Sequence, residues 1–567
     1  YPMFKNRKSN YPLYNIRDLG SLRQLIDEGA TRYGEKPAFR YRTGKSITDV
    51  SYIELRHQMD SFGTALCVLG LESKHIAIIG NNRYEWVLAY LAVLNSNAVV
   101  VPIDKDLSNE ETRYILDFAE CSAVIYSKSV EEKITALTDS LPNITHYICM
   151  DEPSVTDDMH YSMSELLKRG MKLLDGGDKR YLGLSHDVDD LKELLFTSGT
   201  TGKSKGVMLS ESCLCFNIVN SQKMMWISDT CLSVLPYHHA YESTCGILTM
   251  LHHGMSICIN ESLRTLLPNF KVYHPTEVQL VPLFLEKFYR AIWDKIDEKG
   301  KTELFKKLIK TSRALLKVGI DMRGIFFRDV LETFGGKCKS IICGGAPLKP
   351  YIAEFFTDIG ITLINGYGIS ECGPLVTVNR PEFHDYGSVG LPLPGVELMI
   401  YEPNENGEGE ICVKGPNVML GYYKNPEATK KVIIDGWFHT GDMGRIGHDG
   451  FLFITGRIKN MIVLANGKNV YPEEIEDRLA AMSEYIDEVV ISSVAKGDLM
   501  VISAEIYPNR ARAEQKGVAD VEKLIHDTIS KYNDEEPPYK AIKNIVFRDT
   551  PFEKTTTNKI KRKYNTK

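Results

Sequence analysis

The sequence predicts an α/β protein: a large N-terminal region of packed α/β sheets with a β-rich lobe, followed by a small α+β C-terminal domain. From His75 onward, short apolar runs alternate with helical segments. After Tyr386 the pattern changes to short strands separated by glycine turns. Beyond Arg457, an amphipathic segment and further α/β alternation leave enough chain for a separate domain. The 567 residues also exceed what one ordinary core accommodates.

The alternation begins with a predicted βαβ unit. His75 to Gly80 is an isoleucine-rich run typical of a buried strand, Glu85 to Leu94 is typical of a helix, and Ala98 to Pro102 returns as a strand. A helix at Glu110 to Ala119 and a strand at Ala123 to Tyr126 continue the pattern. Because strands and helices alternate, we expect a parallel sheet covered by helices.

Further helices and strands are expected along the chain. A charged, helical stretch covers residues 283–333, and Pro472 to Met482 predicts an amphipathic helix. Short strands are expected at Leu191 to Phe196, Cys231 to Leu235, Ser256 to Ile259, Glu277 to Val281 and Lys339 to Cys343. We divide the chain into an N-terminal region, residues 1–457, and a C-terminal domain, residues 458–567.

Composition excludes several classes of function. With 43% hydrophobic and 25% charged residues the chain is typical of a globular protein, and a net charge of -6 gives no basic field for nucleic acid. The 12 cysteines are scattered and include no Cys-x-x-Cys pair. We therefore expect reduced, mostly buried thiols in a cytoplasmic protein.

No segment is predicted to span a membrane or to act as a secretory signal. Lys5, Arg7 and Lys8 are followed by no apolar run. The most apolar window, Trp86 to Ile103, is interrupted at residues 95–97 by polar side chains. Peripheral contact with a membrane surface remains open, and so does the oligomeric state.

The strongest local signal is a loop rich in glycine, hydroxyl and lysine residues. It follows the apolar strand that ends at Phe196 and comprises Thr197, Ser198, Gly199, Thr200, Thr201, Gly202, Lys203, Ser204 and Lys205. Glycine lets backbone N–H groups approach a phosphate, hydroxyls donate to its oxygens, and lysine supplies charge. We interpret this segment as a phosphate-binding loop.

The loop has two other possible interpretations. A Walker A loop ends in Gly-Lys-Ser, as residues 202–204 do, but requires a glycine where Thr197 stands. A flexible linker is the second, and for a Ser/Thr/Gly run alone it is about equally favoured. The preceding strand and the interleaved lysines favour phosphate binding.

The loop resembles the phosphate loop of the adenylate-forming superfamily, which includes acyl-CoA synthetases, adenylation domains and luciferases. The resemblance continues, in family order, over most of the chain. Its further motifs are Gly344 to Leu348, Asn365 to Glu371, Gly436 to Asp442, Gly456 to Lys459 and Thr557 to Ile560.

This resemblance implies a nucleotide site. Tyr367 stands between two glycines, so its ring can stack on adenine; otherwise it is a core tyrosine. Asp442, in what reads as a turn, would accept the ribose hydroxyls, with Arg457 as a second contact and Ile454 beside them; otherwise it is a plain turn residue. The other pocket residues implied are Gly344, Gly345, Ala346, Asn365, Gly366, Gly368 and Ser370.

The resemblance also implies a catalytic set. Glu371, assisted by Thr197, would bind Mg²⁺, and His239 would lie between the acyl carboxylate and the α-phosphate. A two-histidine metal site with His238 lacks a third ligand at suitable spacing. Lys559 would stabilise the transferring phosphate, although Asn558 stands where family members usually have glycine. The alternative interpretation of the basic tail is an ordinary solvated chain end.

The implied reaction uses ATP, Mg²⁺ and coenzyme A. The carboxylate attacks the α-phosphorus and releases pyrophosphate, and a thiol then attacks the acyl-adenylate and releases AMP. In the family the small domain is mobile and swings between these steps. Lys459 matches the hinge position, and Asn466, Gly467 and Lys468 would line the path of pantetheine.

The acid is expected to be a medium- to long-chain fatty acid. Residues 461–476 and Gly387 to Gly395 resemble bacterial long-chain acyl-CoA synthetases. Amino-acid-activating relatives carry an aspartate near His239, and none is found here, although Glu242 weakens that exclusion. A ligase that charges an acyl carrier protein, and a non-catalytic or luciferase-like nucleotide-binding relative, remain as alternatives.

Overall fold

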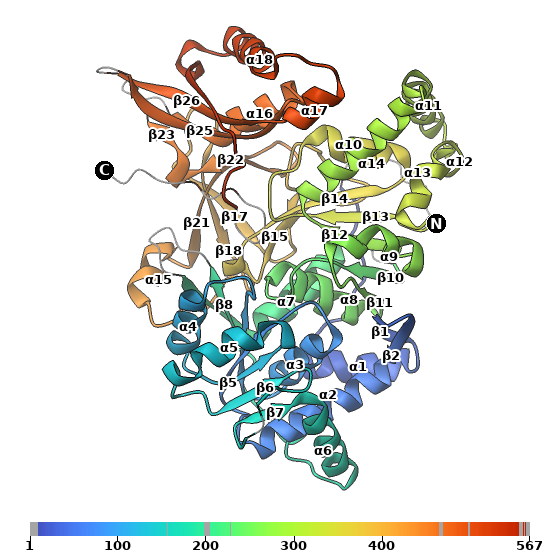
Figure 1. Ribbon diagram of the computed structural model, residues 1–567, viewed down its shortest axis with the longest axis vertical. Coiled ribbons are helices and arrows are strands. Elements are labelled where there is room, and N and C mark those ends of the chain that lie inside the picture. The colour runs from blue at the N-terminus through green and yellow to red at the C-terminus, as the bar shows by residue number, and fades with distance from the viewer. Residues whose placement is uncertain are drawn as a thin grey trace. The chain divides into compact units, whose positions relative to one another are not determined.

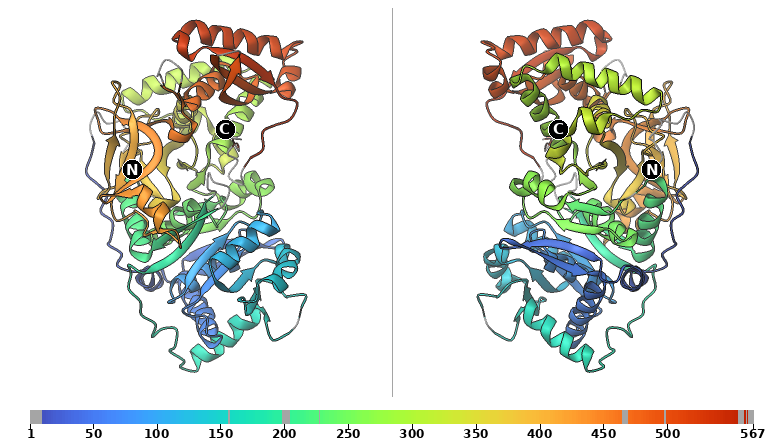
Figure 2. Two further views of the ribbon diagram at one scale, coloured as in Figure 1. Left: turned by 90° about the vertical axis from the view of Figure 1, so that its left-hand side faces the viewer. Right: turned by 90° about the vertical axis from the view of Figure 1, so that its right-hand side faces the viewer.

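The computed structural model describes residues 10–155, 157–197, 204–226, 228–463, 469–496, 499–554, 560 and 562. The chain forms two compact units, shown in Figures 1 and 2. The first comprises residues 1–397 and 413–438, and the second comprises residues 398–412 and 439–567. The strands before and after residues 413–438 therefore pack with the C-terminal part of the chain.

The first sheet of unit 1 has eight strands in the order β19-β9-β8-β4-β3-β5-β6-β7. Its strands are β3 (His75–Ile79), β4 (Val99–Ile103), β5 (Cys121–Tyr126), β6 (His146–Cys149), β7 (His160–Ser162), β8 (Leu191–Thr197), β9 (Lys205–Ser210) and β19 (Gly421–Tyr422). β3 pairs in parallel with both β4 and β5. The predicted βαβ unit is confirmed.

One edge of this sheet departs from the predicted parallel arrangement. β8 and β9 pair antiparallel, and so do β9 and β19. Only residues 198–204 separate β8 from β9, and a parallel crossover needs a dozen residues or more. The short connection therefore forces a hairpin.

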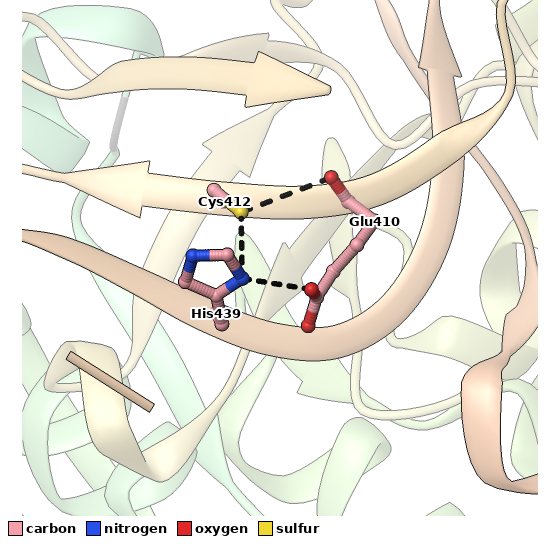
Figure 3. Close-up of side chains that lie close together, drawn as sticks. All are labelled: Glu410, Cys412 and His439. Atoms are coloured by element: carbon pink, nitrogen blue, oxygen red, sulfur yellow. Dashed lines mark hydrogen bonds and ion pairs between the residues drawn. The ribbon is translucent and has the colours of Figure 1, made fainter. Parts of the chain in front are cut away.

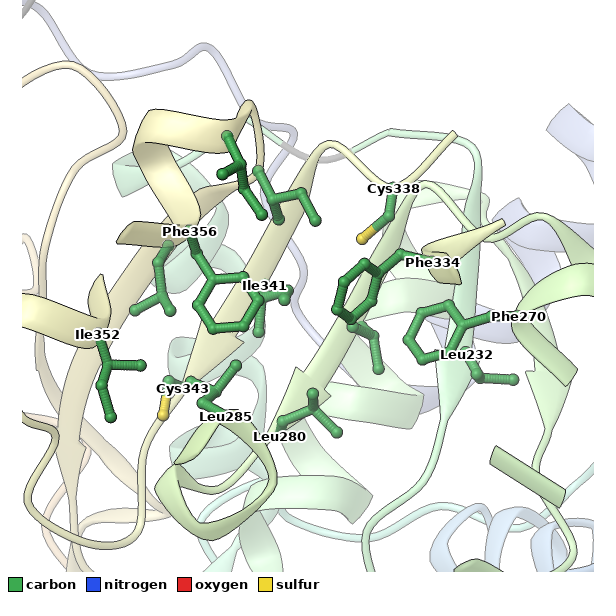
Figure 4. Close-up of a cluster of buried hydrophobic side chains, with 14 of the residues drawn as sticks. Leu232, Phe270, Leu280, Leu285, Phe334, Cys338, Ile341, Cys343, Ile352 and Phe356 are labelled. Atoms are coloured by element: carbon green, nitrogen blue, oxygen red, sulfur yellow. The ribbon is translucent and has the colours of Figure 1, made fainter. Parts of the chain in front are cut away.

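The second sheet of unit 1 has nine strands in the order β16-β15-β14-β13-β12-β10-β11-β1-β2. They are β1 (Pro37–Thr43), β2 (Ser46–Ser51), β10 (Thr230–Ser233), β11 (Ser256–Ile259), β12 (Glu277–Leu280), β13 (Ser340–Cys343), β14 (Thr362–Gly368), β15 (Leu375–Val378) and β16 (Leu391–Pro392). The strands β10 to β14 pair in parallel. Figure 4 shows Phe270, Phe334 and Phe356 packed in the core beside β12 and β13.

Helices of unit 1 connect these strands, as the alternation predicts. α3 and α4 match the expected helices, and the long charged stretch forms α10 to α13. The helices are α1 (Leu22–Tyr33), α2 (Tyr52–Val68), α3 (Tyr84–Leu94), α4 (Asn109–Phe118), α5 (Glu131–Leu137), α6 (Met163–Asp175), α7 (Glu211–Met224), η3 (Tyr241–Leu248), α8 (Thr249–His253), α9 (Leu266–Tyr273), α10 (Pro282–Glu298), α11 (Thr302–Lys317), α12 (Arg323–Phe326), α13 (Arg328–Leu331), α14 (Pro350–Ile359) and α15 (Pro426–Val432). Among them, η3 is a π-helix.

The predicted β-rich lobe is a five-stranded sheet. Its order is β17-β18-β21-β20, with β22 paired to β21. The strands are β17 (Glu397–Tyr401), β18 (Gly409–Lys414), β20 (Ile433–Ile434), β21 (Trp437–Ile446) and β22 (Leu452–Arg457).

Unit 2 continues with a small α+β core built around α16 (Pro472–Met482), which has the predicted bounds. Ile475, Leu479, Ile525 and Ile529 belong to this core. Its other elements are β23 (Ile462–Val463), β24 (Asn469–Val470), β25 (Ile486–Lys496), β26 (Leu499–Pro508), α17 (Arg510–Gln515), α18 (Val521–Glu535) and β27 (Ile542–Phe547). The predicted fold class is confirmed.

Two predictions about the whole chain can be compared with the structure. All cysteines are free, and every one except Cys67 is buried. None of the helices in the described residues has the length and apolar character needed to cross a membrane.

Candidate active site

The predicted phosphate loop joins the two strands of a hairpin. Thr197, at the end of β8, is paired in register with Lys205, at the start of β9. The Lys205 ammonium lies 4.8 Å from the ring centroid of Tyr422 on β19. A Walker A loop leads into a helix N-terminus, whereas this loop leads into a strand, so the structure also disfavours the P-loop reading. Ser198, Gly199, Thr200, Thr201, Gly202 and Lys203 lie outside the described residues.

Glu371 lies beside this hairpin. The Tyr422 hydroxyl donates a hydrogen bond of 2.9 Å to Glu371 Oε1. Burial, reinforced by the Glu371 carboxylate, raises the pKa of Tyr422 far above its usual range, so the phenol keeps its proton. The carboxylate therefore has one oxygen held by a neutral donor. A carboxylate oxygen is the hard ligand that Mg²⁺ prefers, so the residue fits the predicted metal role.

Four of the predicted glycines line one cavity in unit 1. Gly344, Gly345, Gly366 and Gly368 border a cavity of about 70 Å³. A Cβ on Gly368 would come within 2.5 Å of the Pro374 carbonyl oxygen. The glycine is therefore needed to pack β14 against its neighbour, and the motif has a structural reason beside the functional one.

The cavity extends into apolar surroundings. The π-helix η3 places Tyr241 and Cys245 in its wall, with Met250 of α8 and Gln279 of β12 beside them. The Tyr241 hydroxyl donates to the Ile342 carbonyl at 3.1 Å, which fixes the ring. A wall of this composition suits an aliphatic chain more than a charged group.

The neighbouring motif residues are largely covered by protein. The ring of Tyr367 is buried, with 8% of the residue exposed, so its stacking on adenine stays a prediction. The Asn365 amide donates to the Ser388 carbonyl at 3.1 Å. Within the described residues, Asn365 Oδ1 is buried without a hydrogen-bond donor. Ala346 and Ser370 follow β13 and β14 in the chain and are half-buried.

The histidine pair lies before the π-helix. The rings of His238 and His239 are 4.4 Å apart, and His238 Nε2 lies 3.5 Å from an Asp104 carboxylate oxygen. Burial lowers the pKa of His238, and Asp104 opposes that shift. The His239 carbonyl accepts from the backbone N–H of Glu242 at 2.9 Å. Neither imidazole lines the cavity, so the position of His239 beside an acyl carboxylate stays a prediction.

Glu242 does not offer its charge to the cavity. It is fully buried and is absent from the cavity wall. The Ser233 hydroxyl donates to Glu242 Oε1 at 2.5 Å, and burial raises the pKa of Glu242 to about 8. The carboxyl is therefore mostly neutral and offers no negative charge to a substrate amine. Glu242 thus no longer weakens the exclusion of amino-acid substrates.

Asp442 and Arg457 meet on adjacent strands of unit 2. The prediction of a turn at Asp442 is wrong: Asp442 lies within β21, which runs from Trp437 to Ile446. Gly441 accommodates a positive φ of 73° inside this strand, and the pairing with β22 shifts register between Met443 and Gly444. Asp442 is paired in register with Arg457 of β22, and Arg457 Nε lies 2.9 Å from Asp442 Oδ1. Ile454 lies on the same strand and is 36% exposed.

The C-terminal predictions are only partly described. Lys459 lies in a short 3₁₀ turn, and burial is the main cause that lowers its pKa. Lys554 and Ile560 form an antiparallel bridge, and the Arg562 guanidinium lies 2.5 Å from Glu476 Oε2. Asn466, Gly467, Lys468 and Lys559 lie outside the described residues.

Sequence reasoning missed the apolar wall of the cavity. Tyr241, Met250 and Gln279 were not predicted, because they come from separate elements and carry no motif. The one available signal was Gln279, a polar residue between Val278 and Leu280 in a predicted strand.

The chain is similar to known proteins over nearly its whole length. A family model described as AMP-binding enzyme matches residues 26–423. A second model, described as AMP-binding enzyme C-terminal domain, matches residues 459–567. Because the first match covers well over half of the chain, the chain belongs to the AMP-binding enzyme family, and the predicted resemblance is confirmed.

Individual proteins of known name are also similar to this chain. A long-chain-fatty-acid–CoA ligase (FadD15) of Mycobacterium bovis is 30% identical over 81% of this chain and 78% of its own. A chloroplastic long-chain-fatty-acid–acyl-carrier-protein ligase (AEE15) of Arabidopsis thaliana is 30% identical over 89% of this chain and 79% of its own. The Bacillus subtilis o-succinylbenzoate CoA synthetase, solved with its acyl-adenylate intermediate, has 21% identity and a TM-score of 0.71 over 95% of this chain and 96% of its own.

Proposed function

We propose that this protein activates a fatty acid with ATP to an acyl-adenylate, releasing pyrophosphate, and transfers the acyl group to coenzyme A. The observation that carries the proposal is the cavity in unit 1. The glycines that follow β13 and those of β14 line it, and the rest of its wall is largely apolar. A nucleotide motif and an apolar cavity on the same strands suit a reaction between a nucleotide and a fatty acid.

The adenylation step needs positive charge around the α-phosphorus. In our proposal Glu371 and Thr197 hold Mg²⁺, which when bound offsets charge on the phosphate oxygens. Lys559 and the loop at residues 198–203 add donors, and His239 positions the acyl carboxylate. The protein thus acts by positioning and by electrostatic stabilisation, and forms no covalent bond to the substrate.

The nucleotide is proposed to bind through the remaining motif residues. Tyr367 covers adenine beside Asn365, and Asp442 accepts the ribose hydroxyls. The ion pair between Arg457 and Asp442 supports this role, because it holds the carboxylate in one orientation. Ile454 supplies apolar contact on the adjacent strand.

The second step is proposed to require rotation about Lys459, with Asn466, Gly467 and Lys468 along the pantetheine path. We further propose that the boundary between the N-terminal region and the C-terminal domain lies between residues 457 and 458. The second family model begins at residue 459, which supports this boundary. Packing divides the chain elsewhere, because β22 belongs to the same compact unit as α16. A Cβ on Gly456 would lie 3.2 Å from Tyr471, so β22 packs closely against the residue that precedes α16.

A carrier-protein ligase is the second candidate function, favoured by the similarity to AEE15. Both candidates share the adenylation step and differ only in the thiol. Pyrophosphate release should be screened over acids of increasing chain length, with coenzyme A and with a phosphopantetheinylated carrier protein in parallel. Turnover with long-chain acids and coenzyme A supports our proposal. Turnover with the carrier protein but not with coenzyme A would support the carrier-protein ligase instead. Pyrophosphate release without any acid would refute both candidate functions.

We also propose peripheral contact with an anionic membrane surface through α12 and the connection between α11 and α12, both helices being labelled in Figure 1. Val318, Ile325 and Ile320 are 72%, 63% and 49% exposed, and Lys317 precedes them. Exposed aliphatic side chains beside lysine suit a negatively charged bilayer. Replacing all three by serine should abolish co-sedimentation with phosphatidylglycerol vesicles, whereas Leu263→Ser, at a 62% exposed site, should not. Equal binding by both variants would refute this surface.

A cytoplasmic location remains part of the proposal. It is supported by the free cysteines, since thiols persist in reducing compartments.

A further inference from the structure

Three side chains of different chemistry converge on the β-rich sheet of unit 2 (Figure 3). Glu410 and Cys412 are two residues apart on β18, so their side chains share one face of the strand. His439 lies on β21, the neighbour of β18 in the sheet. One ligand atom from each residue lies within 4.8 Å of the other two.

The geometry directs all three donors at one point. His439 Nδ1 lies 2.8 Å from Glu410 Oε2 and 3.4 Å from Cys412 Sγ. A catalytic triad uses the two opposite nitrogens of the imidazole, whereas here both neighbours meet the same nitrogen. The proton shared by His439 Nδ1 and Glu410 Oε2 therefore lies among three atoms that can each donate an electron pair, the third being Cys412 Sγ. A metal ion can replace such a proton.

We propose that Glu410, Cys412 and His439 bind a thiophilic divalent cation of the Zn²⁺ type. A thiolate and an imidazole select zinc-like ions and disfavour magnesium and calcium, which prefer oxygen ligands alone. Zinc adopts tetrahedral coordination, so three protein ligands leave one position for water. Glu410 and His439 retain 17% and 13% exposure, which gives solvent access to that position.

Charge balance favours the same ion. Cys412 is buried, and a buried thiol carries its proton until a metal ion displaces it. On binding, the thiol releases its proton and the imidazole proton moves from Nδ1 to Nε2. The thiolate, the carboxylate and the dication then sum to zero charge, which suits a site with little solvent.

The surroundings hold the ligands in place. The backbone N–H of Gly441 donates to Glu410 Oε1 at 2.9 Å, leaving Oε2 directed at His439. The Tyr401 ring packs against His439 with centroids 5.0 Å apart. Such outer contacts orient metal ligands. A bound ion would tie β18 to β21, three residues before Asp442 on the same strand, and would act structurally.

The direct test is titration of the reduced, metal-free full-length protein with Co²⁺. We expect an intense thiolate-to-cobalt absorption band that saturates at one ion per chain. Cys412→Ser should abolish it, and Glu410→Gln and His439→Ala should each weaken binding at least about ten-fold. Cys67→Ser is the matched control, because Cys67 is the one cysteine that is not buried, and it should retain the band.

Zn²⁺ should also raise the melting temperature of the wild-type protein and leave that of Cys412→Ser unchanged. A wild-type protein without the band, or a band that survives in Cys412→Ser, would overturn the proposal. Neither readout depends on acyl transfer, so the result is independent of the proposed function. Cys412→Ser without added metal should keep wild-type ligase activity, because Cys412 belongs to neither the nucleotide nor the acyl site.

Discussion

At the scale of single residues, the account depends most on Glu371. Its carboxylate is held by the Tyr422 hydroxyl, which burial keeps protonated. A neutral donor fixes the orientation of the carboxylate and leaves its negative charge intact. The residue can therefore serve as a preformed oxygen ligand without a competing cation on that oxygen.

Glu371→Gln should lower the rate of adenylation by about two orders of magnitude, the cost of removing one charge-stabilising group from such a site. Initial rates across a magnesium titration would measure this loss. Tyr422→Phe is the control, because it removes the hydrogen bond but keeps the charge, and it should cost less than ten-fold. Unchanged activity of Glu371→Gln at saturating magnesium would make Glu371 an ordinary carboxylate.

A second prediction at this scale concerns Glu277, a fully buried carboxyl on β12. Its contact in the described residues is the Ser340 hydroxyl, which donates at 3.3 Å. Burial raises the pKa of Glu277 from 4.5 to about 8. Between these values the unfolded chain loses the proton while the folded chain keeps it. Stability is therefore fully present below about pH 4.5 and is lost as the pH rises to about 8.

Glu277→Gln should remove this dependence, because an amide does not titrate. Relative to wild type, the variant should gain stability as the pH rises from 5 to 8, by on the order of 3–4 kcal/mol at the upper end. Melting temperatures across that range would measure the difference. Glu303→Gln, at an 82% exposed side chain, is the control and should run parallel to wild type. Parallel curves for Glu277→Gln would show that burial does not perturb this group.

At the scale of elements, the π-helix η3 lines part of the cavity in unit 1. Its wider turn brings Tyr241 and Cys245 into the cavity wall, and Gly246 packs against the buried Glu242. A Cβ on Gly246 would lie 2.8 Å from Glu242 Cδ. Glu242 cannot move aside without losing its hydrogen bond from Ser233.

Gly246→Ala should therefore destabilise the protein by roughly 1–3 kcal/mol, the usual cost of overpacking a core. Gly324→Ala is the matched control, since Gly324 lies in a helix with no atom within 4 Å of its added Cβ. That change should be neutral or stabilising by up to about 1 kcal/mol. Thermal unfolding of the two variants side by side would decide. Equal melting temperatures would contradict the described packing of η3.

The segment at Lys459 provides the other element-scale test. Rotation about one residue requires two values of φ or ψ, and proline fixes φ near -65°. Lys459→Pro should preserve first-turnover pyrophosphate release and abolish transfer to coenzyme A, a split that general destabilisation would not produce. Rapid-quench analysis of both half-reactions would measure it. Equal loss of both, or loss of neither, would remove Lys459 from the hinge.

At the scale of the whole molecule, much of the architecture could be predicted because local patterns determine it. The βαβ unit at β3, α3 and β4 and the helix α16 follow from periodicity alone. The hairpin of β8 and β9 was not predicted, because the residues that form β9 were not expected to form a strand. Asp442 was expected in a turn because glycine and aspartate favour turns, whereas pairing with Arg457 extends the strand through that point.

The site could be predicted only where a motif carries it. The glycines of β13 and β14 were found from the resemblance, and four of them meet at one cavity. Tyr241 and Gln279 were not, since they reach the cavity from distant parts of the chain. No local sequence pattern signals a π-helix, so the wall of this cavity depends on tertiary structure.

The central claim is that a fatty acid is activated as an adenylate before any thiol takes part. The most direct measurement is exchange of labelled pyrophosphate into ATP, with palmitate present and coenzyme A absent. We predict exchange that requires the fatty acid, is lost in Lys559→Ala, and gives way to equal amounts of AMP and acyl-CoA when coenzyme A is added. Formation of ADP, or exchange that requires coenzyme A, would contradict the account.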